Sequence, residues 1–279
     1  MFNFLHTFEP QAIFVSFGSV SIYWYGLILS VAMLVAIIAS VWLARFYQIR
    51  SEVIVDLAFW LILIGVIGAR LYYVFLEWSY YKSNLWDIAK IWQGGLAIHG
   101  GILFGILVLV VFARRRGVDA WLLASIIVPA TALAQAIGRW GNYFNQELYG
   151  MPTGAPWGIP IAEINRPAVF LQNEYFHPTF LYESLAVLIM AIFLYVAHFV
   201  AMKEKNNLKL NQKAIVLSYL IFYSVIRFVM EEFRIDEVPM VGLWRWPQIL
   251  SAGIALASLA ILVYSAIKQK RQVKLNQNI

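Results

Sequence analysis

Long apolar stretches recur along the chain and leave few folds open to it. Five of them cover residues 20–44, 53–76, 120–137, 214–230 and 248–267, another ends near Ala113, and another runs from His177-Pro178 to near Phe199. A helix needs about 20 predominantly apolar residues to cross the hydrocarbon core of a bilayer. The chain is 62% hydrophobic and 13% charged, whereas soluble domains are about 45–50% apolar and about 25% charged. The pattern predicts an all-α integral membrane protein, one domain over residues 1–279, with about seven transmembrane helices.

The segments between these stretches are expected to lie outside the hydrocarbon core. Residues 1–19 are mixed in polarity and fit an interfacial segment, with no basic region that would mark a cleavable signal peptide. Residues 151–177 form a long external loop rich in proline, glycine and asparagine, and loops of this length usually carry function. Residues 268–279 form a basic cytoplasmic tail, which we expect to be frayed.

The basic residues predict the orientation of the helices. Seven spans put the termini on opposite sides, and the side of the C-terminus receives most of the 21 lysines and arginines. These include Arg45, Arg50, Arg114 to Arg116, the lysines Lys203, Lys205, Lys209 and Lys213, and the tail. Cytoplasmic loops carry an excess of lysine and arginine. We therefore expect the C-terminus in the cytoplasm and the N-terminus outside.

The densest polar cluster follows the fourth apolar stretch. Residues 138–150 place Arg139, Asn142, Asn145 and Glu147 close together, and Gly150 ends the run. Unpaired polar groups at membrane depth cost several kcal/mol, so these side chains must bind something. A helix end with satisfied hydrogen bonds is the structural alternative. Ionisable groups within membranes favour a functional site instead.

Other polar residues fall near the outer ends of other predicted helices. They are Tyr25, Arg70, His99, Glu183, Arg227, Glu231 and Arg234. Arg227 and Glu231 are four residues apart and share a helix face, so they can pair. Arg70 is as consistent with snorkelling or a structural ion pair as with a role in a site. His99 is consistent with a helix cap or with a group that handles a proton or contacts the substrate. Their common depth predicts a polar cavity near the outer leaflet, where arginines suit a phosphate and carboxylates orient the arginines.

Several site classes have no support in the sequence. The absence of cysteine excludes a disulfide framework, a thiolate metal site and a thiol nucleophile. No H-E-x-x-H, P-loop or G-x-S-x-G pattern occurs, so we expect no metal and no cofactor. The residues alone indicate a membrane enzyme acting on an anionic phospholipid, or a transporter or flippase of such a lipid. The transporter predicts inverted repeats, and none is seen.

Thirteen residues carry a family resemblance. The run G-R-W-G-N-Y-F-N-Q-E-L-Y-G at 138–150 resembles the G-R-x-G-N-[aromatic]-[apolar]-N-x-E-x-x-G signature of bacterial prolipoprotein diacylglyceryl transferases. Tyr143 replaces a commoner phenylalanine. Six further segments resemble the motifs of that family, in the same order and between about residues 20 and 255. They are 23–26, 68–70, 95–101, 177–183, 227–234 and 248–251.

The resemblance implies a reaction and a place for it. A diacylglyceryl group would pass from phosphatidylglycerol to the lipobox cysteine of a prolipoprotein, giving a thioether and glycerol phosphate without any cofactor. The enzyme would lie in the bacterial plasma (inner) membrane with its site towards the outer leaflet. Membrane lipid and the prolipoprotein signal-peptide segment would be its partners, and nucleic acid would not.

The reaction and the resemblance together suggest roles for the candidate residues. Arg139 and Arg227 are expected to hold the phosphate that leaves. His99 is the candidate general base, and Glu183 is the alternative. The remaining candidates are expected to bind the substrate or orient the arginines: Tyr25, Arg70, Asn142, Asn145, Glu147, Gly150, Glu231 and Arg234.

Overall fold

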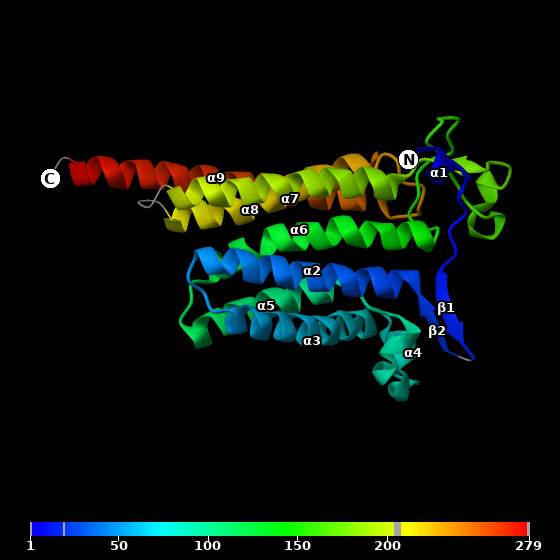
Figure 1. The fold of residues 1–279 in the computed structure, drawn as a ribbon, viewed down its shortest axis with the longest axis horizontal. Helices are drawn as coiled ribbons and strands as arrows, with labels where there is room; N and C mark the ends of the chain where they lie inside the picture. The colour runs from blue at the N-terminus through cyan, green and yellow to red at the C-terminus, as the bar shows by residue number, and fades with distance from the viewer. Residues whose placement is uncertain (1, 19, 204–207, 278–279) are drawn as a thin grey trace. The chain divides into compact units, whose positions relative to one another are not determined.

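The prediction of an all-α membrane protein is confirmed. The computed structural model describes residues 2–18, 20–203 and 208–277. Seven helices in this described part are long and apolar enough to cross a membrane. They are α2 (Trp24–Phe46), α3 (Ser51–Leu76), α5 (Ile98–Arg116), α6 (Ala120–Phe144), α7 (Thr179–Lys203), α8 (Leu208–Met230) and α9 (Trp246–Gln277), labelled in Figure 1.

The chain divides into two compact units. Unit 1 consists of Met1–Ala36 and Ile127–Ile279, and unit 2 of Ile37–Ile126. In unit 1, α8 packs against both α7 and α9, and in unit 2, α3 packs against α5. The expectation of a single domain over residues 1–279 stays a prediction.

Close packing in unit 2 depends on glycines. A Cβ atom built on Gly68 would lie 2.4 Å from the ring of Phe104, and one on Gly100 would lie 2.2 Å from the carbonyl oxygen of Gly68. Neither position has room for a side chain. Small residues let helix backbones approach each other in membranes. Gly68 therefore lies on the face that α3 presents to α5.

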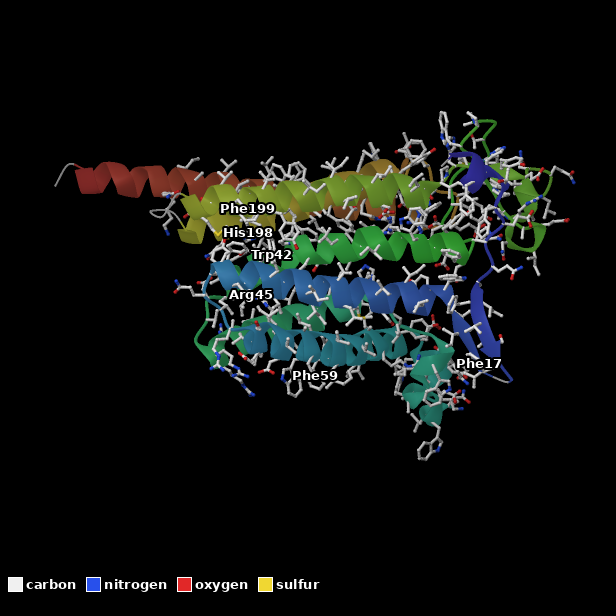
Figure 2. All side chains as sticks on the ribbon, in the orientation of Figure 1. Phe17, Trp42, Arg45, Phe59, His198 and Phe199 are labelled. Atoms are coloured by element: carbon white, nitrogen blue, oxygen red, sulfur yellow. The ribbon has the colours of Figure 1, made fainter. Side chains whose placement is uncertain are left out.

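The first spanning helix begins later than predicted. Residues 20–23 are not helical but form strand β2 (Val20–Tyr23), which pairs antiparallel with β1 (Ile13–Phe17). Alternating β-branched and aromatic residues favour a strand over a helix here. The expected interfacial segment contains this hairpin, with exposed Phe17 labelled in Figure 2, and the short helix α1 (Phe2–Thr7).

Most of the other helices are longer than their apolar stretches. Helix α6 does not end near Ile137 but continues to Phe144, so half of the polar run is helical. Helix α5 reaches Arg116, and α9 reaches Gln277 through the tail that we expected to be frayed. Lysine, arginine and glutamine are good helix formers and extend a helix into water. Lys205, with the rest of 204–207, and residues 278–279 lie outside the described residues.

The segments outside the spanning helices carry short elements. In unit 2 these are α4 (Trp78–Tyr81), η1 (Leu85–Ala89) and η2 (Ile91–Gln93). In unit 1 the expected external loop contains β3 (Ile159–Pro160), η3 (Glu163–Asn165), η4 (Ala168–Phe170) and β4 (Tyr175–Phe176), and strands β5 (Met240–Val241) and β6 (Trp244–Arg245) join α8 to α9. Strands β3 and β4 pair around a core that includes the fully buried Phe176. The loop is therefore a packed structure rather than an irregular one.

Candidate functional site

A buried carboxylate joins two arginines from different helices in unit 1. Glu183 of α7 accepts a hydrogen bond from Arg139 of α6 through Oε1, and the same atom lies 3.5 Å from Nη1 of Arg227 in α8. The Glu183 side chain is 4% exposed, while the two arginine side chains are 20% and 18% exposed. One negative charge thus lies between two positive charges that retain access to the surroundings.

A second buried carboxylate continues the row. Nη2 of Arg227 donates to Glu231 at 3.2 Å, which confirms the pairing predicted from their four-residue spacing. The other oxygen of Glu231 accepts from Nε of Arg245 at 3.0 Å. Arg245 also donates to the carbonyl oxygens of Arg234 at 3.1 Å and Asp236 at 2.6 Å. The hairpin that carries Arg245 is thereby tied to the end of α8.

The helical course of the polar run explains the contacts of Asn142. Arg139 and Asn142 lie three residues apart on α6 and so share a face. Nη1 of Arg139 donates to Oδ1 of Asn142 at 3.3 Å, and Nδ2 of Asn142 donates to Glu147 at 2.7 Å. Glu147 was expected to orient an arginine; its hydrogen bond goes to Asn142, which accepts from Arg139, and the orienting role stays a prediction.

Arg234 has its own carboxylate partner. Its Nε donates to Asp236 at 2.7 Å, and its Nη2 lies 3.4 Å from the other oxygen. Burial raises the pKa of Asp236, but its hydrogen bonds and the charges of Arg234 and Arg245 together lower it by more. The net pKa of Asp236 is below its usual 3.8. This carboxylate therefore stays ionised at neutral pH.

The row as a whole is positively charged. Arginines alternate with carboxylates along a row that begins on α6, α7 and α8 and ends in the segment before α9. Within the described residues, the ion-paired side chains of this row are Arg139, Glu183, Arg227, Glu231, Arg245, Asp236 and Arg234. The arginines outnumber the carboxylates in direct contact with them. Such an excess in a poorly hydrated site favours an anionic ligand, and the planar guanidinium matches a phosphate.

Three other predicted residues lie in the signature run of unit 1 or pack against it. A Cβ atom on Gly141 would lie 2.8 Å from the ring of Tyr25, so Tyr25 packs against the run. Gly150 has no room for a side chain, because a Cβ atom would lie 2.9 Å from His177 and from the Phe233 carbonyl. Asn145 is partly buried where α6 ends, and its backbone N–H donates to the Gly141 carbonyl at 3.0 Å.

Arg70 and His99 belong to unit 2. Arg70 is buried and donates to the carbonyl oxygens of Ile88, Gly94 and Gly95 at 2.9, 2.7 and 2.9 Å. Of the alternatives left open for Arg70, the structural ion pair was wrong, because loop carbonyls rather than a carboxylate take its hydrogen bonds. His99 is exposed in the first turn of α5, with its ring centroid 6.1 Å from that of Tyr72.

The sequence did not single out two residues that organise this region. Arg245 is one of them, and it bridges Glu231 and the backbone just beyond the end of α8. Gln146 is buried at φ 50° and accepts from the Ala162 N–H at 2.7 Å while donating to the Pro10 carbonyl at 2.9 Å. Its position inside the polar run of residues 138–150 could have marked it as a candidate from the sequence alone. Among the described residues, no group of three or more His, Cys, Asp or Glu side chains could hold a metal ion.

Comparisons with known proteins find one family that matches nearly the whole chain. The sequence model of the prolipoprotein diacylglyceryl transferase family matches residues 12–264. The phosphatidylglycerol–prolipoprotein diacylglyceryl transferase of Synechococcus elongatus is 42% identical over 262 residues, 94% of this chain and 90% of that protein. Proteins of the same name from Nostoc sp. and Listeria innocua are 40% and 37% identical, each over 96% of this chain and over 93% and 94% of their own lengths.

Proposed function

Because the chain belongs to the prolipoprotein diacylglyceryl transferase family, we propose that it transfers a diacylglyceryl group from phosphatidylglycerol to a prolipoprotein. The row of arginines around Glu183 and Glu231 is the structural observation that carries the proposal, since it offers positive charge to a phosphate. A transporter or flippase of anionic phospholipid is not favoured, because the relatives are named as transferases.

The acceptor in this proposal is the thiol of a lipobox cysteine. The sulfur attacks the sp3 glycerol carbon that carries the phosphate ester, a C–S bond forms, and the C–O bond breaks. The leaving oxygen keeps the bonding electrons as glycerol phosphate, and the thiol proton passes to a base. A free thiol has a pKa of about 8.5, so the site must favour the thiolate as well as the leaving phosphate.

Arg139 and Arg227 are proposed to stabilise the leaving phosphate. Each guanidinium carries five N–H donors in a planar fork, and the contacts to Glu183, Asn142 and Glu231 occupy only part of them. Donors that are already oriented cost no reorganisation when charge develops on the phosphate. Glu183 contacts both arginines, so we assign it to holding them in place and assign the base to His99.

The remaining predicted residues have supporting parts in this proposal. Asn142 and Glu147 hold Arg139, and Glu231 holds Arg227. Tyr25 and Asn145 are proposed to reach the headgroup or ester oxygens. Arg234, fixed by Asp236, extends the positive surface, and Gly150 keeps the backbone close to His177.

We further propose that the protein lies in the bacterial plasma membrane with the N-terminus outside and the reaction on the outer leaflet. The distribution of lysine and arginine supports this orientation. In unit 1, α1 and the C-terminal end of α9 lie at opposite ends of α7 and α8 (Figure 1), which fits termini on opposite sides of the membrane. The signal-peptide segment and the phospholipid would then meet the enzyme from the same bilayer.

The test is transfer of labelled diacylglycerol from phosphatidylglycerol to a lipobox peptide by the purified full-length protein. Label should reach the cysteine peptide, fail to reach a peptide with serine in place of cysteine, and be lost in Arg139→Ala. His99→Asn should lose transfer as well. Full activity in His99→Asn would contradict the role of His99, and no label on any peptide from a folded, lipid-bound protein would contradict the proposed function.

A further inference from the structure

Unit 2 contains a cavity that none of the residues assigned above lines. Its volume is about 430 Å³. One wall is Trp60 of α3, and the other is the last three turns of α5, with Leu107, Val108, Val111 and Phe112. The glycines that bring α3 and α5 together lie in the other half of both helices. The bulky side chains of this half leave a space whose walls are mainly apolar.

The cavity ends at two arginines, and only one of them has a carboxylate partner in the described part of the chain. Arg115 and Arg116 both line it. Arg116 donates to Asp56 of α3, and its guanidinium lies 5.5 Å from the centroid of the Phe112 ring. Arg115 is exposed and forms no ion pair with any carboxylate in the described part of the chain. One positive charge is therefore compensated and fixed, and the other is available at the mouth of the cavity.

We propose that this cavity binds an anionic phospholipid of the bilayer, with an acyl chain along Trp60 and α5 and its phosphate at Arg115. Both helices are long and apolar enough to span the membrane, so phospholipid surrounds them. Basic pockets between transmembrane helices bind anionic headgroups. A phospholipid supplies both the apolar chain and the negative charge that the cavity complements. The site does not depend on the proposed transfer, because its residues take no part in it.

The experiment uses two photoreactive phospholipids with a diazirine in the same acyl chain. One carries a phosphatidylglycerol headgroup and the other a phosphatidylcholine headgroup. The full-length protein is irradiated in bilayer nanodiscs without acceptor peptide, and mass spectrometry measures the labelling of residues 107–116. The attraction of an anionic headgroup to one surface arginine corresponds to about a five-fold preference over a headgroup without net charge. We expect labelling by phosphatidylglycerol to exceed labelling by phosphatidylcholine by about that factor.

Two charge variants separate the site from general surface charge. Arg115→Gln should lower labelling by phosphatidylglycerol to the level of phosphatidylcholine. Arg114→Gln removes the same charge one residue away, from a side chain that does not line the cavity, and should leave the preference intact. Equal labelling by the two lipids in the wild type, or an equal loss in both variants, would overturn the proposal.

A filling variant tests the acyl chain independently. Leu107→Trp places a larger side chain in the cavity and should reduce the labelling of α5 by both lipids several-fold. Thermal melting near the wild-type temperature shows that this variant is folded. Unchanged labelling in folded Leu107→Trp would mean that the acyl chain does not occupy the cavity. This result would overturn the proposal whatever the two charge variants show.

Discussion

Two partly or fully buried arginines of this protein are held in opposite ways. Arg227 of unit 1 contacts the carboxylates of Glu183 and Glu231, and both carboxylates also contact another arginine. Arg70 of unit 2 donates to backbone carbonyls of one loop and lies 5.2 Å from the ring of Tyr81. Both solutions satisfy a guanidinium in a poorly hydrated place.

This difference indicates which of the two arginines is better placed to bind a ligand. Carbonyl oxygens of the loop surround the Arg70 guanidinium from several sides, so an incoming phosphate would have to displace them. Arg227 shares its carboxylates with Arg139 and Arg245, so the negative charge near it is divided. We therefore expect an additional anion to bind beside Arg227 without breaking the fold. We expect substitutions in the row to affect transfer and substitutions of Arg70 to affect the loop.

The largest effect should come from Glu231→Ala. This removes a fully buried carboxylate from between Arg227 and Arg245. Removing one partner of a buried pair costs about 3–5 kcal/mol, because the other charge is left uncompensated. A thermal melt in detergent should show a strongly lowered midpoint, and transfer should fall with it. Glu237→Ala removes an exposed carboxylate and should leave both unchanged; a similar melt for the two variants would contradict the bridging role.

A smaller effect on stability but a large one on catalysis is expected for Arg139→Lys. The ammonium keeps the charge but lacks the planar fork that holds Glu183, Asn142 and a phosphate together. Loss of one oriented donor to a developing anion typically lowers kcat by about 100–1,000-fold. The measurement is kcat and KM for transfer. Arg166→Lys, which changes an arginine bound to loop carbonyls, is the matched control. Near-full activity in Arg139→Lys would exclude two-point phosphate recognition.

Arg70→Lys should act on structure rather than on the reaction. A hydrogen bond from a charged group contributes about 1.5–3 kcal/mol to stability. The lysine ammonium cannot reach all of the separate carbonyl oxygens that the Arg70 guanidinium reaches. Backbone amides of residues 84–95 should exchange hydrogen faster by about 10-fold or more. Arg50→Lys alters an exposed pair with Glu52 and should leave this exchange unchanged. Unchanged exchange together with lost transfer would assign Arg70 to the substrate instead.

The same comparison shows what the sequence could predict. The seven spans followed from the length of the apolar stretches, and the contact between Arg227 and Glu231 followed from helical spacing. Both depend on neighbours in sequence. The contacts of Arg245 with Glu231 and of Gln146 with Pro10 join distant segments through turns, and no spacing rule describes them. Helix ends were misjudged for a related reason, since charged helix formers extend a helix beyond the apolar core.

The smallest effect should appear in the pH dependence of Asp236→Asn. Arg234 holds the pKa of Asp236 below 3.8, so the ion pair stabilises the fold at every pH above that value and is lost as the pH falls through the lowered pKa. The pair is partly exposed and should contribute no more than roughly 1 kcal/mol. Melting midpoints of the wild type and Asp236→Asn should therefore differ by a constant small amount between about pH 5 and 8 and converge below pH 3.8. A difference that instead changed near neutral pH would mean that another group in the row titrates there, and the row would then take part in proton transfer as well as in binding the phosphate.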